Sequence, residues 1–211
     1  MLHRPVTRRR FDARSVPGLA FADGERVSGS RRILRRLEER VPEPPLLPAD
    51  GAARREVERA EEWGDQVLQP LARRLAWAAI RRDPAAVMRY SDGAELPVPC
   101  WFARVNAPVV ASLSAWVNGA EDVAVRADLV ALPGDLDRVD GWIARGVLGG
   151  AAINAADLQI ASSLRLLLTV GDVAPLIDAR PAGELARRVF GAYPGSVPAG
   201  TLPSGWVPGA A

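Results

Sequence analysis

Residues 16–40 constrain the fold of this chain more than any other segment, because each part of the run has a separate structural role. Val16-Pro17 is an X-Pro step, where a cis peptide bond can set a tight turn. The apolar residues 19–21 are typical of a short buried strand, and Asp23-Gly24 is a strong hairpin-turn signal. Residues 25–27 can then form the returning strand, so the run predicts a small β-hairpin.

A helix is predicted directly after this hairpin. Ile33, Leu34 and Leu37 recur at helical spacing. Ser30 stands just before them, where a serine side chain can accept a hydrogen bond from the first free backbone N–H groups. The sequence therefore predicts Ser30 as the N-cap of this helix.

A proline-rich stretch separates this region from the rest of the chain. Four prolines fall within residues 41–50, and because proline removes a backbone donor and stops helices, we expect a semi-rigid linker there. The chain is accordingly divided into four parts: an α/β region at 1–41, the linker at 42–51, an all-helical domain at 52–192, and an extended Pro/Gly tail at 193–211.

The pattern after the linker is mostly helical, and we expect more than half of the residues to be in helices. Pro70 should kink the first of them, because it cannot donate a hydrogen bond to residue 66. Pro133-Gly134 is expected to separate a helix over 120–132 from another over 136–145.

The segment 149–168 carries the clearest helix-start signal. Asn154 is a favourable N-cap, and Asp157 stands three residues later, so each side chain can bond to the other residue's backbone N–H in a capping box. Asp157 shares a helix face with Ala161 and Leu164. Its carboxylate therefore points toward the core and must be hydrogen-bonded there.

Composition excludes several classes of site. The single histidine, His3, and the single cysteine, Cys100, cannot make a zinc site or an internal disulfide, and no metal is expected. One cysteine fits a reducing cytoplasm. Cys100 is expected to be buried or inert. The 27 basic residues are all arginine, which suggests a GC-rich, bacterial genome. No apolar run reaches eighteen residues, so no membrane span is expected.

The charge is unevenly distributed. The first forty residues hold eleven arginines against five acidic residues, whereas the whole chain has a net charge of +2. A basic front can attract an anionic ligand or a nucleic acid. No stacking aromatic residues interleave with the arginine clusters at residues 8–10, 31–32 and 35–36, and no recognition motif is present, so nucleic-acid binding is not expected.

The order of these motifs resembles the cytosolic glutathione S-transferase family. The Val-Pro strand and the serine-started helix resemble the second half of that family's thioredoxin-like domain, and the capped, Asp-containing helix resembles the signature of its all-helical C-terminal domain. The resemblance implies a mostly α fold, with an incomplete thioredoxin-like α/β region followed by an all-α C-terminal bundle. The first strand-helix-strand of the family's N-terminal domain lacks a counterpart here.

The resemblance also implies roles for particular residues. Val16, before Pro17, would offer its backbone to the cysteinyl part of glutathione, and Ser30 would bind the γ-glutamyl carboxylate. Asn154 and Asp157 match the family's folding motif rather than its binding site. Gly29 departs from the family, which has an acidic or amide residue at that position. The catalytic Ser, Tyr or Cys would belong to the block without a counterpart, so the catalytic residue is unknown.

Two functions follow from these observations. The first is a glutathione S-transferase-like enzyme that conjugates glutathione, its co-substrate, to small electrophiles; the resemblance also allows a homodimer. The alternative is a non-catalytic binding or interaction protein on the same scaffold, which the departure at Gly29 and the basic front favour.

Overall fold

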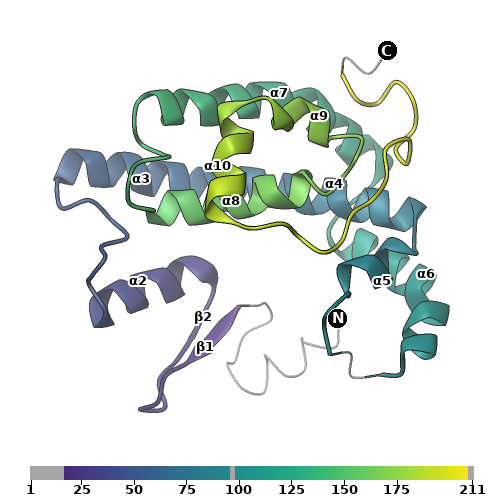
Figure 1. Ribbon diagram of the computed structural model, residues 1–211, viewed down its shortest axis with the longest axis horizontal. Coiled ribbons are helices and arrows are strands. Elements are labelled where there is room, and N and C mark those ends of the chain that lie inside the picture. Colours follow the sequence, from purple (N-terminus) through teal and green to yellow (C-terminus); the bar gives the residue numbers. More distant parts are fainter. Residues whose placement is uncertain (1–16, 96–97, 209–211) are drawn as a thin grey trace.

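The structure is a computed structural model that describes residues 17–95 and 98–208, and it consists mostly of helices (Figure 1). More than half of the described residues are helical, as predicted. Val16 and its peptide bond to Pro17 lie outside the described residues. The elements, in chain order, are β1 (Gly18–Ala20), β2 (Arg26–Ser28), α2 (Ser30–Arg40), α3 (Gly51–Trp63), η1 (Gly64–Leu68), α4 (Gln69–Arg82), α5 (Ala86–Tyr90), α6 (Cys100–Val117), α7 (Asp122–Ala144), α8 (Ala155–Leu167), α9 (Ala174–Asp178) and α10 (Pro181–Val189).

The predicted hairpin forms. β1 and β2 pair antiparallel with Leu19 opposite Val27, and the turn is closed by the Gly24 N–H, which donates to the Phe21 carbonyl at 3.0 Å. Gly24 has φ of 91°, which favours glycine. The expectation of a buried first strand is wrong: Gly18 and Ala20 are exposed and Leu19 is only partly buried. The sheet formed by these described residues has two strands.

Helix α2 begins one residue earlier than predicted. Gly29 is the N-cap, with φ of 91° and ψ of 130°, and its carbonyl accepts the first helical hydrogen bond from the Ile33 N–H at 3.0 Å. Ser30 is the first helical residue, so its prediction as N-cap is wrong. The sharp turn from β2 into α2 needs a positive φ, which glycine adopts without strain and serine does not.

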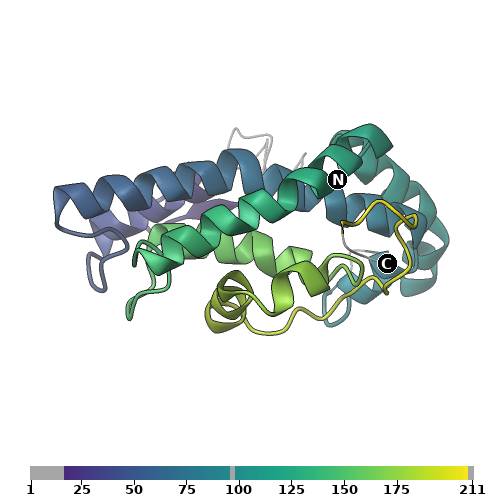
Figure 2. The same ribbon diagram turned by 90° about the horizontal axis from the view of Figure 1, so that it is seen from above.

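A single long rod crosses the molecule and is formed by α3, η1 and α4 (Figure 2). Asp50 caps it, since its carboxylate accepts from the Ala52 and Ala53 N–H groups. The rod does not end at Pro70. Instead the preceding five residues form a π-turn, in which the Gln69 N–H donates to the Gly64 carbonyl five residues back. The wider turn accommodates the hydrogen bond that Pro70 cannot donate.

Helix α7 is also continuous, so the prediction of two helices separated at Pro133 is wrong. Pro133 lies inside the helix, and Leu129, Leu132, Leu136 and Val139 around it are all fully buried. A proline inside a helix costs about 3 kcal/mol. Burying four large apolar side chains contributes about 1.5–3 kcal/mol each, which outweighs that cost.

Helix α8 lies at the centre of the bundle, where it contacts α3, η1, α4 and α10 (Figure 1). Its predicted capping box is confirmed: the Asn154 side chain accepts from the Asp157 N–H, and the Asp157 carboxylate accepts from the Asn154 N–H. Asp157 is fully buried, as its position on the helix predicted.

The residues after α10 return along the bundle. The Val197 N–H donates to the Thr169 carbonyl, and the Gly171 N–H donates to the Val197 carbonyl, both at 2.8 Å. Val197 and Leu202 are buried, and the Trp206 ring lies under the Arg82 guanidinium at 4.8 Å. This segment is therefore packed on the helices rather than free. No described helix is both long and apolar enough to cross a membrane.

Candidate functional site

A pocket of about 310 Å³ lies between the start of α2 and the η1–α4 part of the long rod, and we call it the α2 pocket. It brings two of the residues predicted from the sequence, Pro17 and Ser30, together on one wall. Val16, the third, falls outside the described residues. The pocket is lined by Pro17, Gly29, Ser30, Arg31, Arg32, Asp65, Gln69 and Arg73.

The α2 wall of the pocket is rich in hydrogen-bond donors. The first N–H groups of a helix have no partner within the helix, and no side chain caps those of α2. Within the described part of the chain, the Ser30 hydroxyl forms no hydrogen bond either. The aligned peptide dipoles add partial positive charge at this end of the helix. This wall is therefore suited to an anionic group such as a carboxylate.

The opposite wall was not predicted from the sequence. Asp65, Gln69 and Arg73 stand four residues apart and therefore face the same side of the rod. Their four-residue spacing is readable in the sequence, but nothing in it indicates that this side faces α2. Neither Asp65 nor Arg73 forms an ion pair among the residues that the structure describes, so both charges are available to a ligand.

The π-turn sets where this wall lies. Gly64, at its start, packs so closely on α8 that an added Cβ would lie 2.9 Å from Ile160 Cγ1 and 3.1 Å from Gln159 Cγ. A larger residue would push the rod away from α8. Because Asp65 follows directly, this close approach fixes the wall that carries it.

A buried carboxylate holds the α2 wall against the rod. Glu61 on α3 is fully buried, and it pairs with Arg35 of α2 and, at 3.6 Å, with Arg31 Nε. Arg31 also lines the α2 pocket. The charge of Glu61 is thus used in positioning α2, which leaves the pocket with three arginines and one aspartate.

The other residues singled out in the sequence lie elsewhere. Asn154 and Asp157 do not line the α2 pocket and act in capping α8, the structural role that the resemblance implies. Cys100 is exposed at the start of α6, so it is not buried, and its expected inertness stays a prediction.

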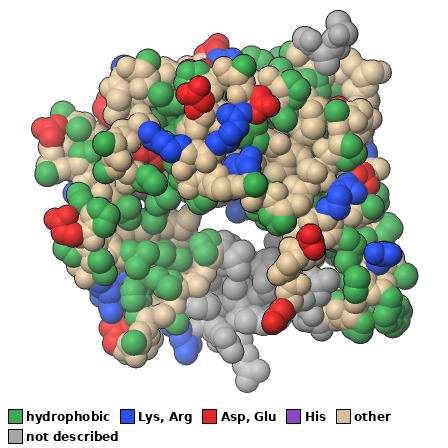
Figure 3. Space-filling model, viewed as in Figure 1, with side chains coloured by type: hydrophobic (Ala, Val, Ile, Leu, Met, Phe, Trp, Pro, Cys, Tyr) green, Lys and Arg blue, Asp and Glu red, His purple; other side chains and the backbone are tan. Residues whose placement is uncertain are grey.

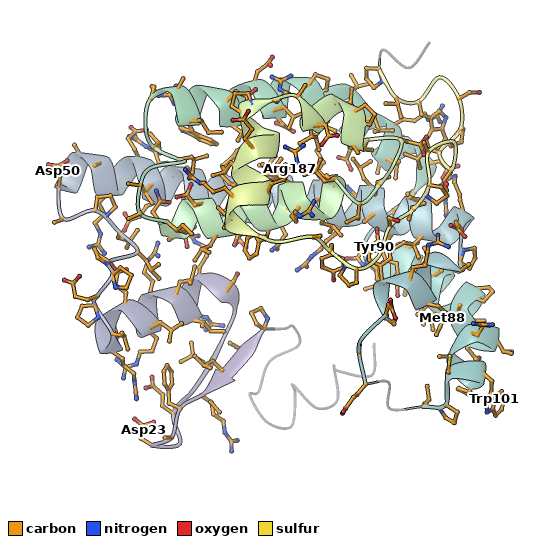
Figure 4. The ribbon with its side chains drawn as sticks, viewed as in Figure 1. Asp23, Asp50, Met88, Tyr90, Trp101 and Arg187 are labelled. Atoms are coloured by element: carbon orange, nitrogen blue, oxygen red, sulfur yellow. The ribbon has the colours of Figure 1, made fainter. Side chains whose placement is uncertain are left out.

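Tyr90 is a partly buried hydroxyl that the sequence did not single out (Figure 4). Its hydroxyl lies 2.5 Å from Thr169 Oγ1, which itself donates to the Leu166 carbonyl, so Tyr90 is the donor. Burial raises the pKa of Tyr90. It lies outside the α2 pocket and connects α5 to the end of α8, which is a structural role.

A second, more apolar pocket of about 500 Å³ lies between α5 and α6 and includes Met88 and Ala107. This pocket lies past the end of α4. Arg82, the last residue of α4, is roughly 14 Å along the helix axis from Arg73 of the α2 pocket, at 1.5 Å per residue. The two pockets share no lining residue. Among the described residues, no three His, Cys, Asp or Glu side chains converge as a metal site would require.

Comparison with known proteins identifies the fold. The structure is similar to the crystal structure of a glutathione S-transferase from Rhodospirillum rubrum F11, with a TM-score of 0.51 and 22% sequence identity, over 85% of this chain and 73% of that one. No family model matches the sequence, and no curated protein matches it. The chain has the glutathione S-transferase-like fold, which confirms the expected fold class: a partial thioredoxin-like region with an all-helical domain.

Proposed function

We propose that the α2 pocket binds the γ-glutamyl end of glutathione, and that the protein uses glutathione as a co-substrate for conjugation to small electrophiles. The observation that carries the proposal is that one pocket combines the uncapped N-terminus of α2 at Ser30 with the charges of Asp65 and Arg73, which form no ion pair with the residues that the structure describes. The γ-glutamyl end is a zwitterion, with a carboxylate and an ammonium on the same carbon. The pocket offers a partner for each charge.

The carboxylate would lie at the start of α2. There it would accept from the Ser30 hydroxyl and from the backbone N–H groups of the first helical turn. Arg73 adds a positive charge from the opposite wall, and charge-assisted hydrogen bonds of this type contribute more than neutral ones. Pro17, at the entrance to β1, would shape the wall beside the cysteinyl part, whose backbone would pair with Val16.

The ammonium would pair with Asp65. The glutathione S-transferase family, which the sequence resembles, usually has an acidic or amide residue at the position of Gly29. Glycine has no side chain with which to bind the ammonium. In this chain Asp65 and Gln69 bring a carboxylate and an amide into the same pocket from the helical domain. We propose that they replace the missing side chain.

Catalysis would require a group that lowers the pKa of the glutathione thiol, so that the thiolate attacks the electrophile. None of the residues that line the α2 pocket is a tyrosine or cysteine. Ser30 is assigned to the carboxylate. The hydroxyl or thiol donor for this step is therefore left unassigned.

Isothermal titration with glutathione tests the pocket. Ser30→Ala, Asp65→Asn and Arg73→Gln should each weaken binding by on the order of 1–3 kcal/mol, the cost of removing one hydrogen bond to a charged group. Arg145→Gln is the matched control, since it removes the same charge from an exposed site outside the α2 pocket. Equal affinity of the Ser30→Ala variant and the parent for glutathione would show that glutathione does not bind at the start of α2.

Turnover of a model electrophile separates the two functions. Glutathione-dependent conjugation above the buffer rate, reduced in the same variants, supports the enzyme. Binding that these variants weaken, without any turnover, would instead support the non-catalytic binding protein.

A further inference from the structure

Helix α6 exposes an unusually apolar face. Three aromatic and four aliphatic side chains on it are solvent-exposed over 42–74% of their surface. We call the following seven residues the α6 face: Trp101, Phe102, Val105, Val109, Val110, Leu113 and Trp116. Figure 3 shows hydrophobic side chains gathered at the end of the molecule where α6 lies, and Trp101 is at its outer edge (Figure 4).

The α6 face lies opposite the side of the helix that packs on the bundle. Five of its residues, from Trp101 to Trp116, recur at intervals of four, four, four and three, which keeps them on one side. The buried alanines 107, 111 and 115 recur at intervals of four on the other side. Arg104 is the one charged residue among the eighteen of α6. A helix of a soluble monomer ordinarily presents charged residues on its outer face, and α6 does not.

The exposed apolar area is at the upper limit of what a monomer ordinarily leaves in water. A whole aromatic side chain covers about 150–250 Å², so the exposed fractions of Trp101, Phe102 and Trp116 together present roughly 300–450 Å². The four aliphatic side chains of the α6 face add to this area. The largest apolar patch of a typical monomer is about 300–600 Å², and such a patch is often functional.

The pocket between α5 and α6 runs along one edge of the α6 face. Arg104 and Pro108 line this pocket, and each directly precedes a valine of the face. Met88, an adaptable apolar side chain, lines it from α5 (Figure 4). Arg89 also lines it, but its guanidinium is bound to Asp83 and to the Ser196 carbonyl.

Arg104 differs from Arg89 in that its charge is not used within the fold. It forms no ion pair with any residue that the structure describes, and its side chain is exposed. A free positive charge therefore stands where an apolar pocket and an apolar helix face meet. This combination suits a molecule that has an apolar part joined to an anionic group.

We propose that the α6 face docks on a phospholipid bilayer that contains anionic lipid, with α6 lying in the plane of the membrane surface. Helices that bind in this way present aromatic and aliphatic residues on one face, and their affinity combines buried apolar area with attraction to anionic headgroups. Trp101 and Trp116 stand at the two ends, and tryptophan favours the level of the headgroups. Arg104 would bind a headgroup phosphate, and the pocket beside it would receive part of an acyl chain of that lipid.

The distribution of charge favours a bilayer over a protein surface. A protein interface ordinarily has an apolar centre and a polar rim. The α6 face has no acidic residue, and the first acidic residues after it, Glu121 and Asp122, lie beyond its end. Asp122 is neutralised there by Arg81 and Arg82, at 2.6 and 2.8 Å. A face with one free positive charge and no negative charge complements the negative surface potential of an anionic membrane.

Co-sedimentation of the full chain with sucrose-loaded vesicles tests the proposal. The parent should bind vesicles of mixed phosphatidylcholine and phosphatidylglycerol. Val109→Asp should weaken this binding by on the order of tenfold, because a valine no longer enters the apolar layer. Val41→Asp is the matched control, since Val41 is 62% exposed but lies after α2, and it should bind like the parent. Circular dichroism checks that each variant is folded.

The contribution of Arg104 is measured by lipid composition. Arg104→Gln should weaken binding to the phosphatidylglycerol vesicles about fivefold, the effect of one arginine near an anionic surface, and should leave binding to pure phosphatidylcholine unchanged. Arg145→Gln, at an exposed site outside the α6 face, should change neither. Equal losses for Arg104→Gln on both kinds of vesicle would contradict the contact with an anionic headgroup.

Cys100 reports the docking geometry independently of affinity. It is the single cysteine, it is exposed, and it directly precedes Trp101. An environment-sensitive fluorophore on Cys100 should shift its emission to shorter wavelength when vesicles are added. The same fluorophore on Val41→Cys, in a Cys100→Ser background, should not shift.

Two results would overturn the proposal. One is a parent that binds neither kind of vesicle, or that binds without a shift in the Cys100 fluorophore. The other is a parent that self-associates through Val109 and does not bind vesicles, which would assign the α6 face to a protein partner. Glutathione titration of Val109→Asp should match the parent, because the α6 face and the α2 pocket share no residue.

Discussion

At the scale of single residues, Asp157 has the most demanding position in the chain. It is fully buried, and its two carboxylate oxygens accept from the Gly149 N–H at 2.8 Å and the Asn154 N–H at 3.0 Å. One oxygen thus caps α8, and the other holds the loop that leads from α7. Both donors are backbone groups that would otherwise lack a partner, so the carboxylate fixes two segments of chain at once.

Replacing Asp157 with alanine should therefore destabilise the protein. Two backbone donors would lose their partner, and each unsatisfied buried group costs about 1–3 kcal/mol. We expect a loss of at least 2 kcal/mol, which lowers the melting temperature by roughly 4–8 °C in a chain of this size. Asp178→Ala is the control, because that carboxylate is mostly exposed and pairs only at the surface. An unchanged melting temperature for Asp157→Ala would contradict the capping role.

At the scale of elements, the β-hairpin depends on α2 for much of its stability. A two-stranded hairpin by itself is marginal in water. Here Arg40 of α2 lies over the Phe21 ring at 4.1 Å and reaches Asp23 and Glu25, each at 2.5 Å. Arg36 donates three further hydrogen bonds to the Glu25 carboxylate. The hairpin is thus attached to α2 mainly through carboxylate–guanidinium contacts.

This attachment should be lost in acid. The hydrogen bond from the Glu25 N–H, followed by Arg40, lowers the pKa of Asp23 below 3.8. Arg36, followed by Arg40, lowers the pKa of Glu25 below 4.5. Because both values are lower in the folded state, the unfolded state takes up protons first. The contribution to stability is complete above about pH 4.5 and is lost as the pH falls through the lowered values.

Amide chemical shifts of Leu19 and Val27, which are paired across the hairpin, report this change. They should stay constant from pH 7 to 5 and move below pH 4, while the helices of the bundle stay intact. Glu25→Gln should shift them at neutral pH and reduce the further change in acid. Glu43→Gln, an exposed position in the linker, should titrate like the parent. A hairpin that is unchanged at pH 2.5 would show that the ion pairs do not hold it.

At the scale of the whole molecule, polar contacts join residues 17–41, the described region before the linker, to the helical bundle. Besides the pairs of Glu61 with α2, the Leu47 N–H donates to Glu38 of α2, and the Ala155 N–H donates to the Leu46 carbonyl of the linker. Leu47 is buried in the core. The linker therefore makes hydrogen bonds both to α2 and to the start of α8. Since α2 forms one wall of the α2 pocket, these contacts also determine its shape.

Glu61→Gln should loosen this junction. Hydrogen bonds to charged groups contribute about 1.5–3 kcal/mol. Arg31 and Arg35 are each about a third exposed, so water can partly replace the lost carboxylate and offset part of this cost. We expect a loss of about 2 kcal/mol and faster proteolysis within residues 17–41, with the helical domain unaffected. In a double-mutant cycle, Arg35→Met should cost much less in the Glu61→Gln background than in the parent. Additive costs would show that the pair does not join the two regions.

The sequence by itself determined the features that depend on neighbouring residues. The Asp23-Gly24 turn and the capping box of Asn154 and Asp157 both lie where the sequence predicts them. Each is a short-range match between a side chain and a backbone group a few positions away, so its energy does not depend on the rest of the fold. The predominance of helix follows from the apolar spacing for the same reason.

Only the tertiary structure decided the features that depend on distant parts of the chain. Pro133 does not interrupt α7, because the buried residues around it gain more from packing than the missing hydrogen bond costs. Gly29 rather than Ser30 is the N-cap of α2, because the turn from β2 into α2 requires a positive φ. The α2 pocket unites Ser30 with Asp65 and Arg73, more than thirty residues away, through a rod whose position the close contact of Gly64 with α8 sets. Residues that are separated in sequence meet only through packing, and local patterns carry no information about that packing.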